Sequence, residues 1–469
     1  MAQYRVALAG RIEKLPHSRP TRRATIAAMA HSRRQFFSNL ALPGLLIGAG
    51  PSVEALSRLA PLAHRSFREG EFSPDAQADD ASVFGEARSH FLIPPGVAYC
   101  NTGTLGASPR EVVDALTQGI RRLETELAAW PYEQPDGEPL TGYQRLDGVR
   151  AAVARFINAT GPEVALTQNA TMGMNFLANG LDLGAGDEVV STDQEHGGGI
   201  SPWRLLAKRR GIMVKELALE PALAESPEAV VRLFAGAMTP RTKVVMFSHI
   251  TSGLGALLPA RELCALARER GALAIVDGAQ AVGQIRVDVR ALGCDAYVGS
   301  PHKWMMAPKG TGFMYLRKDV QDRFWTTLAS YQWDNHDDGV FRFMQYGTGS
   351  VPVVEGLTAA LQFIDRIGMP RIERWDAMLT KRLRDGLARI PKARVASPAD
   401  PRLAAAITTF GVEGVKAKAL QDALWERRVR VRAQNDARGV RLSAHLYVST
   451  ANVDTILEVT DHLARTTRG

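Results

Sequence analysis

The chain has 469 residues and a mass of 51.0 kDa, enough for a large domain and a smaller one, each with its own core. Its hydrophobic fraction of 45% and charged fraction of 23% are typical of a globular enzyme, and they exclude a disordered chain or an integral membrane protein. The chain has 57 basic and 49 acidic residues, and eight of the basic residues but only one of the acidic ones lie in residues 1–34. The rest of the chain is therefore nearly neutral, so no nucleic-acid partner is expected.

The N-terminal region combines a charged segment with an apolar one. Ser32-Arg33-Arg34-Gln35-Phe36-Phe37 precedes an apolar stretch over residues 40–50, which is too short to span a bilayer as a helix. The order resembles a twin-arginine signal, which a receptor reads to move folded proteins across the bacterial inner membrane. We therefore expect a leader over residues 1–63, the twin-arginine translocation machinery as a partner, a periplasmic location and no stable membrane insertion. If the paired arginines are only part of a basic leader, a cytoplasmic location is the alternative.

Two helices are predicted to follow an N-terminal arm over residues 64–107. Ser108-Pro109-Arg110-Glu111 predicts a capping box with proline at the first helical position, opening an amphipathic helix that runs toward Trp130. A second helix is predicted over residues 144–157.

Short runs rich in Val and Ile then alternate with helical patterns. This alternation predicts an α/β fold whose mostly parallel central sheet is covered by helices, in a large domain over residues 108–349. Ligands bind such sheets at the carboxyl ends of the strands. The predicted strands are residues 164–167, 188–191, 212–217, 244–247, 273–276, 296–298 and 312–316.

The pattern changes after Gly349, where we predict a smaller α+β domain over residues 350–469. It begins with a long helical stretch over residues 355–390. Strands are predicted near residues 404–410 and 428–432, and helices over residues 416–426 and 453–464.

Lys303 lies in Ser300-Pro301-His302-Lys303-Trp304, directly after a predicted strand. A lysine that forms an imine must be held uncharged beside a carbonyl, and enclosure together with a nearby cation lowers its pKa enough for that. Most lysines are solvated charges, so the surrounding motifs must decide.

Asp277 ends another predicted strand, in Asp277-Gly278-Ala279-Gln280. A carboxylate enclosed at a strand end needs a cation, and the protonated pyridine nitrogen of pyridoxal 5'-phosphate (PLP) is such a partner. Gln280 would reach the phenolic oxygen of the ring. Taken alone, Asp277 would be interpreted as a helix N-cap.

Two further loops add to this set. Residues 166–173 join a strand to a helix beginning near Met172, and free N–H groups with a hydroxyl at a helix start suit a phosphate. His196, in the Gly-rich loop Glu195-His196-Gly197-Gly198-Gly199, could stack flat on a heteroaromatic ring. Alone, the first would be an ordinary N-cap and the second a structural histidine.

Together these motifs resemble the class V aminotransferase family of fold-type I PLP enzymes, which includes cysteine desulfurases and isopenicillin N epimerase. The family's pattern of Asp-x-x-Gln and then Ser-x-His-Lys stands here as Asp277, Gln280, Ser300, His302 and Lys303. The resemblance extends from residue 97 to the C-terminus.

The resemblance implies a role for each matching residue. Lys303 would hold PLP as a Schiff base and move the Cα proton, His196 would stack on the ring, and Asp277 would pair the ring nitrogen. Gln280 is expected at the phenolic oxygen, and Ala170, Thr171, Ser300 and His302 at the phosphate. Thr251 stands where desulfurases carry an asparagine, so its role is open, and Thr348 matches a residue that dimers lend to the neighbouring subunit's phosphate. At the substrate we expect Asn101 and Arg441, with the arginine on the α-carboxylate.

One departure from the family narrows the expected reaction. Desulfurases carry a nucleophilic cysteine shortly before the C-terminal arginine, and residues 433–439 contain none. The three cysteines, Cys100, Cys264 and Cys294, form no Cys-x-x-Cys pair, so we expect buried thiols and neither a metal site nor a disulfide.

We therefore expect a homodimeric aminotransferase acting on a small-molecule amino acid or a peptidyl amine. An isopenicillin N epimerase-like epimerase or racemase and a C–S lyase are alternatives, because each also begins at the bonds of Cα. The choice depends on which bond at Cα lies perpendicular to the ring, which the sequence does not show. A PLP-binding module without turnover is the non-enzymatic alternative.

Overall fold

The computed structural model describes residues 79–127 and 146–467. The predicted leader, with Arg33 and Arg34, and the first part of the arm lie outside the described residues, as does Trp130. Within those two ranges, no helix is long and apolar enough to cross a membrane.

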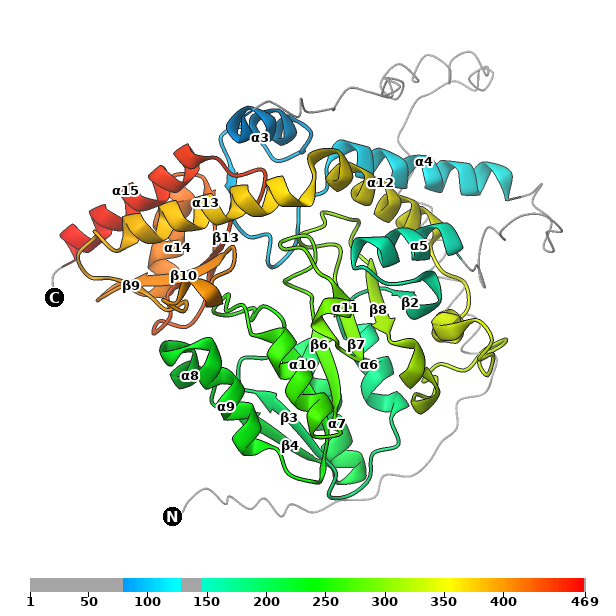
Figure 1. Ribbon diagram of the computed structural model, residues 1–469. Helices are drawn as coiled ribbons and strands as arrows, with labels where there is room; N and C mark the ends of the chain where they lie inside the picture. The colour runs from blue at the N-terminus through cyan, green and yellow to red at the C-terminus, as the bar shows by residue number, and fades with distance from the viewer. Residues whose placement is uncertain (1–78, 128–145, 468–469) are drawn as a thin grey trace, which may run out of the picture. The chain divides into compact units, whose positions relative to one another are not determined.

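A seven-stranded sheet forms the centre of the large domain (Figure 1), in the order β2-β8-β7-β6-β5-β3-β4. The pairs from β4 through β3, β5 and β6 to β7 are parallel, and β8 is antiparallel to both of its neighbours. The predicted α/β class with a mostly parallel sheet is confirmed. The strands are β2 (Val164–Thr167), β3 (Glu188–Thr192), β4 (Met213–Leu217), β5 (Thr242–Ser248), β6 (Leu273–Asp277), β7 (Ala296–Gly299) and β8 (Gly312–Leu316).

Helices cover both faces of this sheet, so every residue of β2, β3, β6, β7 and β8 is buried. Helix α6 begins where the Asn169 side chain accepts a hydrogen bond from Met172 N, and α7 ends at Gly211, whose φ of 75° suits glycine. The helices along this part of the chain are α6 (Ala170–Gly180), α7 (Gly197–Arg210), α8 (Glu220–Glu225), α9 (Pro227–Ala237), α10 (Ala260–Glu269) and α11 (Val289–Leu292).

The predicted capping box before α4 (Arg110–Glu126) is wrong. Pro109 is the N-cap residue, and no side chain makes a capping hydrogen bond. Ser108 Oγ instead donates to Ala307 O (3.3 Å), and Glu111 Oε1 pairs with His90 Nδ1 (2.7 Å). Tertiary partners therefore take both side chains. The helix α3 (Asp80–Ser89) precedes this region, and the second predicted helix is α5 (Asp147–Phe156).

The long helix predicted over residues 355–390 is two helices, α12 (Val351–Ile367) and α13 (Met369–Leu387). Gly368 separates them with a φ of 86°, and Pro370 follows at the start of α13, so an uninterrupted helix is not possible here. Helix α12 packs beside α4 and α5, next to the large sheet (Figure 1).

The C-terminal part contains a four-stranded antiparallel sheet in the order β12-β13-β10-β9. The strand predicted over residues 404–410 begins later, at Ile407, and β9 was not predicted. Helices α13, α14 and α15 pack on this sheet (Figure 1). The domain boundaries near residues 108 and 350 stay a prediction. The elements are β9 (Ala393–Val395), β10 (Ile407–Val412), β12 (Arg432–Ala433), β13 (Val440–Ser443), α14 (Ala417–Glu426) and α15 (Thr450–Thr466).

The end of the N-terminal arm joins the two sheets. Strand β1 (Ala98–Tyr99) pairs in parallel with β11 (Val429–Arg430), and the Asn101 backbone bridges to Ser443 of β13. Five residues later, Gly106 N donates to His302 O (2.9 Å). A Cβ at Gly106 would come within 1.8 Å of Lys303 O, so this approach requires glycine. The arm thereby crosses from the C-terminal sheet to the loop that carries Lys303.

Candidate active site

Asp277 is the last residue of β6 and is buried. Its Oδ1 accepts a hydrogen bond from Ala279 N (2.9 Å), while Oδ2 makes none with the described residues. Turns follow β6, so Asp277 does not cap a helix. A Cβ at Gly199 would approach Oδ2 to 2.9 Å, so glycine at that position leaves room beside the carboxylate. The free oxygen of the carboxylate can thus accept a hydrogen bond from a cation.

Lys303 lies in the turn after β7, with its backbone N donating to Ser300 O (3.0 Å). Burial lowers the pKa of Lys303 to about 8. The charge of Asp277 opposes this shift, and the charges of Arg441 and Arg432 add to it. About a tenth of this amine is therefore uncharged at pH 7, far more than for an ordinary lysine, and the uncharged form is the one that attacks a carbonyl.

Gln280 is buried and held at both ends of its amide. Its Nε2 donates to Gly103 O (2.8 Å), and its Oε1 accepts from Trp304 Nε1 (2.9 Å). The indole donor fixes which amide atom is the oxygen. The second N–H of the amide stays available for an acceptor such as the predicted phenolic oxygen.

His196 is the N-cap residue of α7. The run of glycines after it suggested a flexible loop, but these glycines form the first turn of the helix. Its Nδ1 accepts from Gly198 N (3.1 Å), so the neutral ring carries its proton on Nε2. His196 is exposed, but the protein around its ring still removes part of the water there. This desolvation, together with the positive charge of Lys303, lowers the pKa of His196. A neutral, open ring face suits stacking on a heteroaromatic group.

Glu195 was missed by the sequence analysis. Its two carboxyl oxygens accept from Thr192 Oγ1 (2.7 Å) and Ser248 Oγ (2.6 Å). Burial raises the pKa of Glu195 to about 7; the two hydroxyl bonds oppose the shift and the charge of Asp277 adds to it. The motif around His196 includes this glutamate, but its neighbours come from other strands, which the sequence does not reveal.

The start of α6 carries the residues that were predicted to contact a phosphate, and their role there stays a prediction. Ala170 N donates to Ser300 Oγ (3.0 Å), which leaves the hydroxyl proton of Ser300 available. The N–H and hydroxyl of Thr171 lie at the exposed helix start, where the helix dipole favours an anion. A Cβ at Gly198 would come within 2.1 Å of Thr171 Oγ1, so α6 and α7 start side by side.

His302 faces the same region from the Lys303 turn. Its Nδ1 donates to Thr311 O (3.1 Å), because a carbonyl can only accept. Burial lowers the pKa of His302, so without an anion the ring is neutral and its Nε2 carries no proton. A phosphate beside it would favour the protonated ring, which can then donate.

Thr251 and Thr348 differ in their surroundings. Thr251 is fully buried, and its Oγ1 accepts from Ala256 N (3.0 Å) within its own turn. Thr348 is exposed in the loop before α12, where it lines a surface hollow of about 390 Å³. That position suits a contact with a second subunit, so the homodimer stays a prediction.

Arg441 on β13 is buried, and all of its hydrogen-bond partners are neutral. Nη1 donates to Ser252 O (3.0 Å), and Nη2 donates to Thr104 Oγ1 (2.6 Å) and Asn101 Oδ1 (3.3 Å). Its Nε has no partner, and no carboxylate of the described residues pairs with it. Burial lowers the pKa of Arg441 to about 10, with the charge of Arg432 adding to the shift. A buried guanidinium without a counter-ion is matched to a carboxylate from outside the chain.

Asn101 acts on this site through Arg441, because its side-chain oxygen already accepts from the guanidinium. Thr104, which also donates to Asn101 Oδ1 (2.8 Å), and Ser252 were missed by the sequence analysis. Nothing in their local sequence marks them, since they meet Arg441 only after the arm and the loop following β5 converge on β13.

The prediction of buried thiols is confirmed. Cys100, Cys264 and Cys294 are all buried, and burial raises the pKa of Cys100 and of Cys264 to about 12. Thiols of this kind are inert as nucleophiles. In the part of the chain that the structure describes, no group of three His, Cys, Asp or Glu side chains could hold a metal ion.

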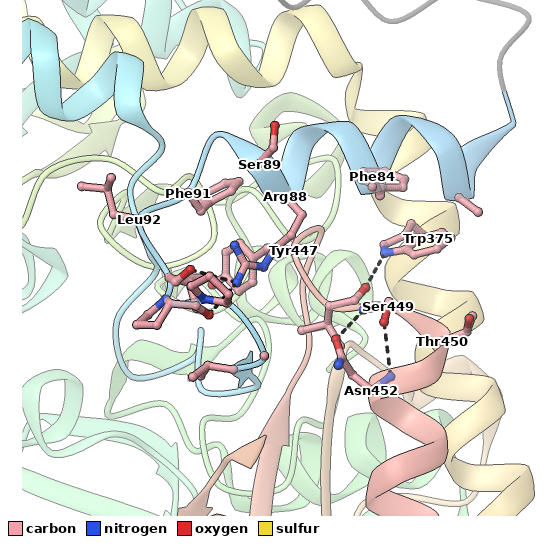
Figure 2. Close-up of a pocket in the computed structure, with 18 of the residues that line it drawn as sticks. Phe84, Arg88, Ser89, Phe91, Leu92, Trp375, Tyr447, Ser449, Thr450 and Asn452 are labelled. Carbon is pink, nitrogen blue, oxygen red and sulfur yellow. Dashed lines mark hydrogen bonds between the residues drawn. The ribbon is translucent and has the colours of Figure 1, made fainter. Parts of the chain in front are cut away.

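A separate hollow of about 670 Å³ lies between α3 and the start of α15 (Figure 2). Phe84, Phe91, Trp375 and Tyr447 contribute its aromatic walls, and Trp375 Nε1 donates to Val448 O (3.1 Å) beside it. None of the predicted site residues lines this hollow. The groups that carry chemistry are instead those around Lys303.

Comparison with known proteins identifies the family. A family model described as aminotransferase class-V matches residues 109–456. The chain belongs to the class V aminotransferase family. It is 30% identical over 406 residues to isopenicillin N epimerase from Amycolatopsis lactamdurans, covering 82% of this chain and 100% of that relative. It is 27% identical to a probable cysteine desulfurase from Pyrococcus abyssi, covering 82% and 98%.

The fold comparison agrees with this assignment. A cysteine desulfurase from Thermococcus onnurineus NA1 superposes with a TM-score of 0.71 at 26% identity, covering 82% of this chain and 98% of that one. The fold is therefore that of fold-type I PLP enzymes, and the protein is a PLP-dependent class V enzyme. The residues fit the cofactor, because Asp277 Oδ2, the start of α6, the open His196 ring and the Lys303 amine provide a partner for each of its parts.

Proposed function

We propose that this class V enzyme removes the Cα proton of an amino acid or peptidyl amine with a free α-carboxylate, and that transamination is the outcome. The observation that carries this proposal is the buried Arg441 guanidinium, which has no carboxylate partner among the described residues and lies in one site with Lys303 and Asp277. A substrate carboxylate supplies the missing counter-ion and orients Cα.

Each residue has a distinct part in this reaction. When bound, PLP supplies an aldehyde for attachment of the substrate amine and a ring that accepts electrons. Asp277 holds the ring nitrogen protonated, and Arg441 binds the α-carboxylate. The Lys303 amine, with a pKa of about 8, takes up the Cα proton and returns it.

Transamination is the outcome that requires the fewest acid–base groups. A single amine on one face of the substrate can remove the proton and return it on that same face, to a neighbouring atom. Inversion of Cα additionally requires a proton donor on the opposite face. Epimerisation is nevertheless the second candidate, because the chain resembles two isopenicillin N epimerases at 30% identity over at least 98% of their length. The buried thiols disfavour desulfuration that uses a cysteine nucleophile.

Two measurements test the proposal. Purified protein loaded with PLP is reduced with borohydride, and peptide mapping is expected to find the adduct on Lys303, whereas a Lys303→Ala variant gives none. The holoenzyme is then incubated with a panel of amino acids in D2O. A 2-oxo acid product selects transamination, Cα deuteration with loss of optical purity and no oxo acid selects epimerisation, and an unreactive cofactor across the panel contradicts both.

We also propose that the protein is exported through its twin arginines and works as a homodimer. The support is the basic and apolar order of residues 32–50 and the exposed position of Thr348. Replacing Arg33 and Arg34 with lysine is expected to retain the protein in the cytoplasm of a bacterial host, measured by fractionation. A monomer in sedimentation experiments, with full PLP binding, would contradict the dimer.

A further inference from the structure

Arg432 lies directly opposite Arg441 in the C-terminal sheet. Strand β12 pairs with β13 in antiparallel register, and the Cα partners are Arg432 and Arg441. Side chains of directly paired residues lie on the same face of a sheet, with Cβ atoms about 5 Å apart. Thr409 of β10 is the partner of Arg441 on its other side, and its hydroxyl donates to Gly253 O (2.6 Å). This row of three residues therefore faces the loop after β5 that borders the substrate site.

Arg432 differs from its neighbouring arginines in having no partner. It is exposed, and it makes no ion pair or side-chain hydrogen bond within the described ranges, although the segment is rich in such contacts. Among the neighbouring arginines, Arg427 pairs with Glu458 and Arg438 with Glu220. Arg428 and Arg430 lie over the ring of Trp425.

The positive charge of Arg432 affects the pKa values of three residues in the active site. It lowers the pKa of Arg441, of Lys303 and of His196, after the larger effect of burial in each case. Two like charges directly opposite each other in a sheet destabilise it. An amino acid with one carboxylate compensates Arg441 only, so a second anionic group on the substrate would remove the remaining repulsion.

We propose that Arg432 binds a second acidic group of the substrate, and that the enzyme prefers amino acids or peptidyl amines carrying two carboxylates. This inference rests on the proposed function for one point, that the α-carboxylate occupies Arg441. The α-carboxylate then meets the buried guanidinium, and the distal acid meets the exposed one at the mouth of the site. Arg432 is in this view a specificity-determining residue, because it contacts a part of the substrate remote from Cα.

The test uses carboxylates that lack an amine, so that it depends on neither turnover nor reaction with the cofactor. Binding of glutarate and of pentanoate to the holoenzyme is measured by calorimetry; the two have equal chain length and differ by one carboxylate. Glutarate is expected to bind about 10- to 100-fold more tightly, as a charge-assisted contact warrants. Arg432→Gln is expected to abolish this ratio and leave pentanoate affinity unchanged, and Arg432→Lys to retain part of it.

Arg427→Gln is the matched control, since it removes the same charge from an exposed arginine of the same domain that pairs with Glu458. It is expected to keep the wild-type ratio. Equal affinities of the wild-type protein for the two acids, or equal weakening of both by Arg432→Gln, would overturn the inference. Preference for glutarate in a protein that never reacts with amino acids would instead support the subsite and contradict the proposed function, so the two failures are distinguishable.

Discussion

His445 Nε2 donates a hydrogen bond to the carbonyl oxygen of Trp304 (2.9 Å), the residue that follows Lys303. On its other side, His445 Nδ1 lies 2.8 Å from Asp376 Oδ2 on α13, and both side chains are buried. Because the carbonyl can only accept, Nε2 carries a proton, and a second proton is shared between Nδ1 and the carboxyl. Burial raises the pKa of Asp376, and His445 opposes this effect. The pair thereby ties the C-terminal part to the lysine turn.

This pairing predicts different effects for two substitutions at Asp376. Asp376→Ala leaves a buried histidine without its partner and is expected to lower the free energy of unfolding by about 3 kcal/mol. Asp376→Asn can donate to Nδ1 of a neutral ring, so a loss of about 1 kcal/mol or less is expected. Urea unfolding of both variants measures the difference. Equal losses in the two would show that the hydrogen bond to His445 is not what stabilises this region.

The pKa of Lys303 predicts how loading with PLP depends on pH. The uncharged amine attacks the aldehyde, so the rate of covalent attachment to apoprotein is expected to rise with pH, with a midpoint near 8, and to level off above it. Arg441→Leu removes a charge that lowers this pKa, so its midpoint moves to higher pH. Asp277→Asn removes a charge that raises it, so its midpoint moves to lower pH. Absorbance changes after mixing with PLP measure all three, and midpoints that do not separate in these directions would contradict the assignment.

Glu195 predicts a pH-dependent difference in stability. The folded pKa of Glu195, about 7, lies above the ordinary value of 4.5 for a glutamate, so the folded protein binds the proton more tightly than the unfolded chain. This contribution is fully present below about pH 4.5 and is lost as pH rises toward 7. Glu195→Gln cannot ionise, and the stability of this variant relative to the wild type is expected to improve across that window by about 1–3 kcal/mol. Urea unfolding of the two apoproteins between pH 4.5 and 8 checks this, and a difference that stays constant would refute it.

The sequence predicted the parts of the site that depend on local order along the chain. Asp277 ends one buried strand and Lys303 follows another, and parallel strands bring their carboxyl ends to one edge of the sheet, so the meeting of the two residues could be expected. Glu195, Thr104 and Arg432 could not be found in this way. Their roles arise from partners on other elements: the hydroxyls around Glu195, the arm that delivers Thr104 to Arg441, and the register of β12.

The same distinction explains the errors in the fold. The motif from Ser108 to Glu111 has the residue types of a capping box, but Ala307 and His90 compete for its side chains. Local propensity is a weak prior where tertiary contacts offer better partners. Gly368 stands inside a helical pattern, and the sequence alone does not show whether the chain continues through a glycine or turns there.

Gly106 provides a final prediction, because this glycine is required by a close approach rather than by its backbone angles. A Cβ there would lie 1.8 Å from Lys303 O and 3.2 Å from His302 O, so Gly106→Ala must displace the arm or the lysine turn. We expect PLP affinity to fall at least tenfold and the free energy of unfolding to fall by about 1–3 kcal/mol. Gly148→Ala, in α5 with nothing within 4 Å of the added Cβ, is the matched control and should be neutral or slightly stabilising. Fluorescence titration with PLP and urea unfolding measure both variants, and a Gly106→Ala protein that binds PLP like the control would show that the arm does not hold the turn in place.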